Sequence, residues 1–319
     1  MKKIIFSNPL APGDILISTS AIRDLHKAYP GEYLTDIRVP TGCEQIFENS
    51  PYITKLDDKD PECEKIAMEY PDIHNSGWSG RPFVTAHTLF LSEKLGRPIP
   101  HTSLRPDIFL SQDERLWPSP VLKEHGYSGK YWIINAGIKN DYTLKYYHRY
   151  QEVVDTLKGK IQFVQVGQIQ HSHPPLNGVL SMLGKTDLRQ LFRLSYFAEG
   201  SVNCVSLQMV VMAALGKPCV VVSGGREPVR WQLIPDHRFL AVNGSIECAK
   251  WDGCWKNTMP GPGKDPEKSC SNPTDFEGRQ VPLCMQMIRP SMIVEAIEMY
   301  YEGLVLTYDN HEYEKELVQ

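Results

Sequence analysis

Four cysteines close together in the second half of the chain have the chemistry of a metal site. Cys248, Cys254, Cys270 and Cys284 follow the spacing C-x₅-C-x₁₅-C-x₁₃-C, and residues 244–284 hold five glycines and five prolines. A segment with so few core-forming side chains needs a crosslink to become ordered. Four thiolates around one ion supply it, because their binding energy becomes local folding energy. The pattern predicts a structural metal, with zinc as the default ion; disulfides and unlinked thiols are the alternatives.

A carboxylate opens the first predicted helix. In PLAPGDILISTSAIRDL, Gly13 allows a sharp turn and Asp14 stands at the start of an apolar helical pattern. In one interpretation, Asp14 caps the helix by accepting backbone N–H groups. In the other, it lies at the mouth of a ligand cleft and takes the proton from an attacking substrate hydroxyl. The two roles are compatible.

Loops that follow predicted strands in the second half carry cations and helix starts. In NAGIKNDYTLKYY, Lys139 and Lys145 lie near Gly137, an arrangement suited to a phosphate or diphosphate, although solvated lysines look the same. Ser206 precedes the helix LQMVVMAALG, whose N-terminus favours an anion. A plain cap on a buried helix is the alternative there.

The glycine turn in VVVSGGREPVRW combines exposed backbone N–H groups with charge. Gly224 and Gly225 follow an apolar strand, and Arg226 and Glu227 come next. A bare glycine pair is often only a turn. The segment is not a Walker loop, and the chain contains no G-x-G-x-x-G fingerprint.

A loop in the first half gathers aromatic and basic side chains. HNSGWSGRPFVTAHTLF contains His74, Trp78, Arg81 and His87, which have the chemistry to stack on and hydrogen-bond a sugar or base. A structural histidine in a packed core is the alternative for either imidazole.

Alternating strands and helices must position these loops. The first half predicts strands at 2–7, 33–39 and 53–56 and helices at 15–29, 45–47 and 82–95. The pattern restarts near 126–129, with strands at 131–137, 161–167 and 217–225, helices at 146–157, 187–198 and 207–216, and a final helix at 291–304. Such alternation implies two parallel sheets, which bind ligands at the carboxyl ends of their strands, in a cleft where the two halves face each other.

Bulk composition excludes some classes of protein. The chain has 319 residues, 41% of them hydrophobic and 23% charged, and a net charge of −4, so no strong basic field favours nucleic acid. The apolar start MKKIIF ends at Ser7, which is too short for an export signal, and no apolar run is long enough to span a membrane. We therefore expect a cytoplasmic protein. The remaining cysteines, Cys43, Cys63, Cys204 and Cys219, are expected to be mostly small buried apolar side chains.

Three of these stretches together resemble a known family. PGDILISTSAIRDLHKAYP, GKTDLRQLFRLSYFAEG and AALGKPCVVVSGGREPVRW are similar, in order and spacing, to segments of glycosyltransferase family 9, the bacterial heptosyltransferases. The resemblance implies a GT-B fold: two Rossmann-like domains and a C-terminal helix that crosses back to the first. It also implies inverting sugar transfer from a nucleotide sugar, commonly ADP-heptose, without a metal in the chemistry. The cysteine block resembles the iron-holding insertion of the autotransporter-modifying heptosyltransferases.

The resemblance assigns roles to some residues. Asp14 matches the family's general base, Lys145 matches a lysine on the donor diphosphate, and Gly224-Gly225 falls in its donor loop. The family's Asp-Ser/Thr-Gly-x-x-His run reads here as Val205-Ser206-Leu207-Gln208-Met209-Val210, so both the acid and the histidine are replaced.

The domains expected on this basis are 1–125 on the acceptor side, 126–290 for the donor, including a cysteine knuckle at 244–286, and a helix and tail at 291–319. The expected acceptor is a glycan or a protein. Transfer to a modified DNA base and a non-catalytic nucleotide-sugar-binding protein are the alternatives, and the sequence does not indicate an oligomeric state.

Overall fold

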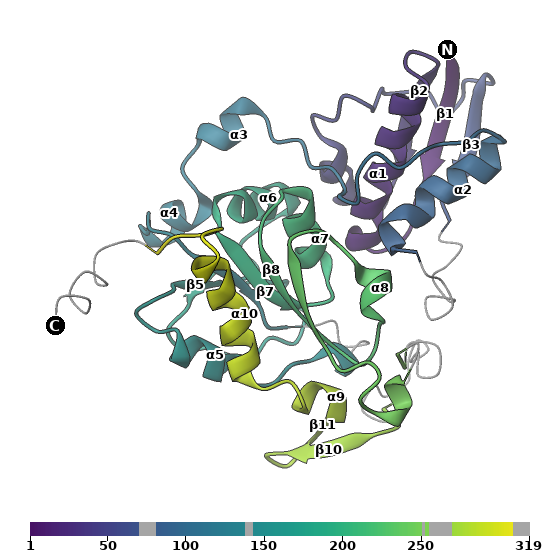
Figure 1. Ribbon diagram of the computed structural model, residues 1–319. Coiled ribbons are helices and arrows are strands. Elements are labelled where there is room, and N and C mark those ends of the chain that lie inside the picture. The colour runs from purple at the N-terminus through teal and green to yellow at the C-terminus, as the bar shows by residue number, and fades with distance from the viewer. Residues whose placement is uncertain (70–80, 138–142, 251–252, 255–269, 309–319) are drawn as a thin grey trace.

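The computed structural model describes residues 1–69, 81–137, 143–250, 253–254 and 270–308 (Figure 1). This part of the chain forms two α/β units, each built on its own parallel sheet, and a small antiparallel hairpin. The first sheet has the strand order β2-β1-β3, with β1 at Lys2–Ser7, β2 at Tyr33–Arg38 and β3 at Cys63–Ala67. Its central strand, β1, is apolar because helices and loops bury both of its faces.

One helix dominates the first unit. The helices of this unit are α1 (Pro12–Ala28), η1 (Cys43–Phe47), η2 (Phe83–Thr85) and α2 (Ala86–Leu95). Every residue of α1 from Ile15 to Leu25 is buried, so the helix packs against more than its own sheet. Buried polar groups on it are paired: Arg23 donates to the Asp107 carboxylate, and Thr102 donates to the Asp24 carboxylate.

The second sheet has six parallel strands in the order β6-β5-β4-β7-β8-β9. The strands are β4 (Trp132–Asn135), β5 (Phe163–Gln165), β6 (Leu180–Ser181), β7 (Gly200–Cys204), β8 (Cys219–Gly224) and β9 (His237–Ala241). The chain winds outward from β4 to β6 and then returns to place β7 on the other side of β4. The winding direction therefore reverses between β4 and β7, which is where doubly wound sheets bind ligands.

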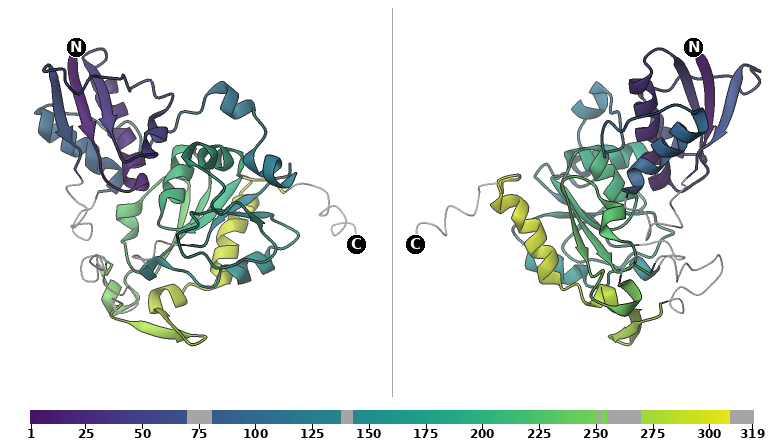
Figure 2. Two further views of the ribbon diagram at one scale, coloured as in Figure 1. Left: turned by 180° about the vertical axis from the view of Figure 1, so that it is seen from behind. Right: turned by 45° about the vertical axis from the view of Figure 1, so that its right-hand side comes forward.

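Helices cover both faces of this sheet, as Figure 2 shows. They are η3 (Thr143–Lys145), α5 (Tyr150–Thr156), α6 (Leu188–Phe197), α7 (Leu207–Ala214), α8 (Val229–Gln232), η4 (Glu247–Ala249), α9 (Leu283–Gln286) and α10 (Pro290–Glu302). The alternation along β8 explains the two layers, since Val220 and Val222 pack with α5 and α10 while Val221 packs with α7. Among the described helices, none combines the length and the apolar character that a membrane crossing requires.

The remaining elements connect and extend the two units. Two short helices, α3 (Gln112–Leu116) and α4 (Pro120–His125), connect the units, and strands β10 (Pro273–Phe276) and β11 (Arg279–Pro282) form the hairpin. The expectation that the last helix crosses to the first domain was wrong for the described residues. α10 packs on α5, β8 and β9 of the second unit and lies away from the first unit in Figure 1, because its apolar face fills the core under Trp132 and Val220.

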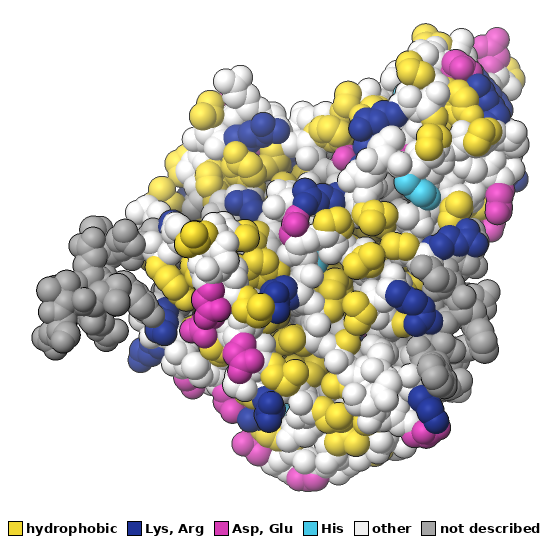
Figure 3. Space-filling view, viewed as in Figure 1, with side chains coloured by type: hydrophobic (Ala, Val, Ile, Leu, Met, Phe, Trp, Pro, Cys, Tyr) yellow, Lys and Arg dark blue, Asp and Glu magenta, His cyan; other side chains and the backbone are white. Residues whose placement is uncertain are grey.

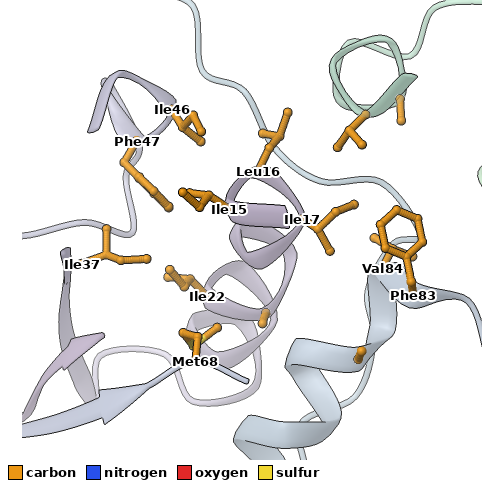
Figure 4. Packing of buried hydrophobic residues seen from close by; sticks show 14 of the residues in the cluster. Ile15, Leu16, Ile17, Ile22, Ile37, Ile46, Phe47, Met68, Phe83 and Val84 are labelled. Atoms are coloured by element: carbon orange, nitrogen blue, oxygen red, sulfur yellow. The ribbon is translucent and has the colours of Figure 1, made fainter. Parts of the chain in front are cut away.

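The two units share one hydrophobic core. Leu16 and Ile17 of α1 belong to the same buried cluster as Val210 and Val211 of α7. In Figure 4, Ile15 points toward Phe47 and Ile22 points toward the sheet of the first unit, whereas Leu16 and Ile17 point away from that sheet, Ile17 toward Phe83. The Phe83 ring in turn packs on Trp231, with 4.9 Å between ring centroids. We call the contact between α1 and α7 the seam.

The expected third strand is in a different place. Residues 53–56 form an irregular segment beside β2. Only one of their hydrogen bonds to β2 joins two backbone groups, from the Thr54 N–H to the Thr35 carbonyl, whereas the Leu56 N–H donates to the Asp36 carboxylate. The third strand is β3, whose sequence CEKIA is interrupted by two charged residues, Glu64 and Lys65. It is an edge strand with one exposed face, so it lacks the apolar run that predicts a buried strand.

Candidate functional site

Three of the predicted loops meet at the point where the second sheet reverses. Lys145, at the end of η3 after β4, donates from Nζ to the Val205 carbonyl at 3.3 Å, directly after β7. The same Nζ lies 2.8 Å from Oε1 of Glu227, in the loop after β8. The side chain of Lys145 thus joins the carboxyl ends of β4, β7 and β8. We call the surrounding region the switch-point site.

The ion pair of Arg226 and Glu227 at this site is buried. Glu227 is 1% exposed and Arg226 is 2% exposed, and the Arg226 guanidinium pairs with the Glu227 carboxylate. Burial alone would raise the pKa of Glu227, but the cations of Arg226 and Lys145 outweigh it and hold that pKa below its usual value. The Glu227 carboxylate is thus held by two cations, and cationic side chains at this edge of the sheet suit an anionic ligand.

Several polar atoms around Lys145 have no hydrogen-bond partner among the described residues. They are Asn135 Oδ1, Ser206 Oγ, Ser223 Oγ and Glu227 Oε2, all buried. Ser206 is the N-cap residue of α7, as expected, but its hydroxyl makes no cap bond. Because a buried polar atom without a partner costs free energy, such a cluster indicates where a polar ligand completes the structure.

Sequence reasoning left Asn135 and Ser223 out of the site. Each ends an apolar strand, in WIIN and VVVS, and a polar residue at the carboxyl end of such a strand was the available signal. Both strands flank β7, so their last residues lie at the same edge of the sheet.

The predicted donor residue Gly137 has a packing role. An added Cβ at Gly137 would lie 2.0 Å from the His173 ring, and one at Gly167, after β5, would lie 1.8 Å from the same ring. Only glycine leaves room for this imidazole at the ends of both strands. Burial lowers the pKa of His173, so the ring is neutral at pH 7. His173 is a further residue at this edge that the sequence did not single out.

Asp14 lies beside the start of α7. The N-cap of α1 is Ala11, and Asp14 falls in the first turn of the helix, so the interpretation of Asp14 as the N-cap was wrong. A Cβ added to the neighbouring Gly13 would lie 3.5 Å from the Leu207 Cα, in ordinary contact. The seam therefore brings Gly13, the residue before the predicted base, into contact with Leu207 of the second unit.

The buried His87 ring contacts the backbone of Asp14. The ring is 0% exposed, and its nitrogens face the backbone carbonyls of Glu69 and Asp14. Burial lowers the pKa of His87 to about 4, so the ring is neutral at pH 7. Direct stacking of His87 on an acceptor does not fit this burial. Arg81 is exposed just before η2, whereas His74, Trp78 and Lys139 lie outside the described residues.

All four cysteines of the predicted knuckle line one small cavity of about 20 Å³, roughly the space of one water-sized sphere. None of them forms a disulfide. Burial, followed by the charges of Cys254, Cys270 and Cys248, raises the pKa of the Cys284 thiol to about 12. Four soft sulfur donors around one cavity fit a zinc or iron ion by ligand chemistry.

The knuckle lacks coordination geometry as it stands. As positioned, no three His, Cys, Asp or Glu side chains of the described residues gather closely enough to hold an ion. Of the other four cysteines, Cys43, Cys204 and Cys219 are buried, as expected, and Cys63 is partly exposed.

Comparison with solved structures decides the fold. The ADP-heptose LPS heptosyltransferase II of Escherichia coli superposes with a TM-score of 0.60 at 15% identity, over 95% of this chain and all of that one. A glycosyltransferase family 9 protein from Veillonella parvula gives 0.61 at 16% identity, over 93% and 96%. The chain has the GT-B fold.

A third solved structure with this fold contains iron. The iron-containing dodecameric glycosyltransferase TibC of enterotoxigenic Escherichia coli, solved with ADP-D-β-D-heptose, superposes with a TM-score of 0.64 at 17% identity, over 94% of this chain and 76% of that one. No protein-family model matches the chain, and no curated protein sequence matches it. At these identities, the likeness establishes the fold.

Proposed function

We propose that this GT-B protein is an inverting glycosyltransferase that uses a nucleotide diphosphate sugar, with ADP as the favoured nucleotide. The observation that carries the proposal is the ion-pair network of Lys145, Arg226 and Glu227 at the switch point, together with the contact across the seam between Gly13, which directly precedes Asp14, and Leu207 at the start of α7. Residues 126–290 would hold the donor, and residues 1–125 would hold the acceptor.

In the proposed reaction, Asp14 accepts the proton of an acceptor hydroxyl. The hydroxyl oxygen forms a bond to the anomeric carbon as the bond from that carbon to the diphosphate oxygen breaks, and the configuration inverts. The bond's electron pair leaves with the diphosphate. Lys145, the Ser206 hydroxyl and the N-terminal N–H groups of α7 stabilise the developing charge. These groups supply the stabilisation that a divalent cation gives in other transferases, so we expect no catalytic metal.

We propose a glycan or protein acceptor in the cytoplasm. DNA is disfavoured by the net charge of −4. In the face shown in Figure 3, Lys and Arg side chains are scattered among acidic and neutral ones and form no basic stripe. A weak, salt-independent response to duplex DNA is the expected result in a binding assay.

We also propose that Cys248, Cys254, Cys270 and Cys284 hold a structural zinc or iron ion. The cavity that they share supports this, as does the iron in TibC, which has the same fold. The ion would crosslink a glycine- and proline-rich segment and take no part in sugar transfer. Elemental analysis should find one ion per chain in wild-type protein and a loss in Cys254→Ser. Wild-type protein that is folded and fully soluble as purified, before any chelator is added, yet contains no metal contradicts this assignment.

A non-catalytic nucleotide-sugar-binding protein is the second candidate. It is favoured by one observation: the family's donor acid and histidine are replaced by Val205 and Val210, and Val210 is buried in the seam. Such a protein would bind a nucleotide sugar and release no nucleotide.

A panel of ADP-, UDP-, GDP- and CMP-linked sugars separates the two. We expect one donor to raise the melting temperature and to be slowly hydrolysed to free nucleotide by the wild-type enzyme. Asp14→Asn should keep the thermal shift and lose the release. Stabilisation without release by wild-type protein indicates the binding protein, and no response to any donor contradicts both.

A further inference from the structure

The cysteine cavity and the switch-point site share a wall. Besides the four cysteines, the cavity is lined by Leu144, Gly225 and Arg226. Leu144 directly precedes Lys145, and Arg226 directly precedes Glu227. The residues on the far side of this wall are therefore the buried ion pairs at which we place the donor diphosphate.

Two of the cysteines hold the backbone of this wall. The Cys254 N–H donates to the Gly225 carbonyl at 3.1 Å, and the backbone of Gly225 also hydrogen-bonds the Cys284 sulfur. An added Cβ at Gly225 would lie 2.7 Å from the Ala249 Cβ and 3.2 Å from the Cys284 Cβ, so the peptide has no room to shift toward the knuckle.

Gly253 fixes the next peptide. Its φ is +69°, and an added Cβ would lie 2.2 Å from the Arg226 carbonyl oxygen. The Arg226 and Glu227 side chains then continue from this backbone to Lys145, which in turn reaches the Val205 carbonyl. Contacts thus run without a break from the cysteines to the start of α7.

We infer that the four-cysteine knuckle is a positioning element of the donor site, so that binding of its metal and binding of the donor nucleotide strengthen each other. The inference rests on the proposed function. A crosslink that only ordered residues 244–284 would need no contact with the donor loop, whereas here the Gly225 carbonyl accepts the backbone N–H of Cys254 and Gly225 packs against Cys284. Thermodynamic linkage requires the coupling to be reciprocal.

The test measures ADP binding by calorimetry in metal-loaded protein and in the same protein after reduction and chelation. We expect chelation to weaken ADP binding by about tenfold or more, with the far-ultraviolet circular dichroism unchanged. Saturating ADP should tighten metal retention against a competing chelator by the same factor. Chelated protein that binds ADP as tightly as loaded protein overturns the inference and leaves the proposed function standing. Loaded protein that binds no ADP or ADP-sugar overturns both.

A matched pair of variants separates coupling from general damage. Gly253→Ala keeps all four thiols but presses on the Arg226 carbonyl, so it should retain metal and bind ADP more weakly. Gly278→Ala places the same strain at φ +79° in the β10–β11 hairpin, where an added Cβ meets nothing within 4 Å. It should bind metal and ADP as wild type does. Equal ADP affinity in the two variants, at equal metal content, overturns the inference.

Discussion

Leu16 provides a direct test of the seam. Its side chain is 0% exposed and lies in the core cluster that α1 shares with α7. Truncation to alanine removes a fully buried side chain and leaves a cavity, which costs about 3 kcal/mol. With a urea dependence of about 3 kcal/mol per molar for a chain of this size, the unfolding midpoint should fall by about 1 M.

The informative result is where the loss appears. Because the two units share one core, wild-type protein should unfold in a single urea transition. In Leu16→Ala, native-state hydrogen exchange should rise in both α1 and α7, by roughly 100-fold for 3 kcal/mol of lost protection. Leu157→Ala is the matched control. Leu157 is equally buried but packs in the core between the second sheet and α10, so the α1 amides should keep their protection.

Two results would refute this reasoning. If Leu16→Ala increases exchange in α1 alone, then the shared cluster does not couple the units. If wild-type protein already unfolds in two separate transitions, then the seam contributes too little free energy to join them. Either result would also weaken the case that Asp14 is held beside the switch-point site.

Two further outcomes follow from buried charge. Lys145→Met should weaken ADP binding by about 10- to 100-fold in calorimetry, since a charge-assisted contact to the diphosphate is lost, while Lys158→Met on the exposed surface should change nothing. Burial depresses the pKa of His87 to about 4 and that of His237 to about 3, so the unfolded chain takes up these protons first and stability present above pH 6.5 is lost as pH falls toward 4. Urea titrations at pH 7 and 5 should differ by about 2 kcal/mol for each histidine, and His87→Phe should remove about half of the difference.

Local sequence patterns predicted most of the elements but not their contacts. The apolar runs at β1, β4 and β8 and the helical periods of α1, α6 and α7 are strong local signals, and each element formed where expected. β3, β6, β7 and β9 were missed, because none of these short strands has the apolar run that predicts a buried strand: β3 reads CEKIA and β7 reads GSVNC. The sequence did not determine whether His87 is buried, because the residues around a histidine do not show whether its ring faces backbone carbonyls or solvent.

The sequence predicted single residues of the site, but it did not predict which of them contact each other. Lys145 and Glu227 each follow a strand, which marks both as residues at the carboxyl edge of the sheet. Their 2.8 Å contact depends on the strand order β4-β7-β8, and no local pattern encodes that order. The same holds for the cysteines: their spacing predicts a crosslink, but not that the crosslink touches Gly225.

The apolar side chains of Val205 and Val210 fit the packing of the seam. An Asp at 205 and a His at 210 would place polar groups at the start of α7, where Leu207 now abuts Gly13 and Val210 packs into the core with α1. A buried acid or imidazole there would need a partner that this apolar contact does not offer. Apolar side chains at these two positions therefore favour the close approach of the two units. In the function proposed above, Lys145 and Arg226 are the cations left to bind an anion, and both contact Glu227, which adjoins the cysteine wall.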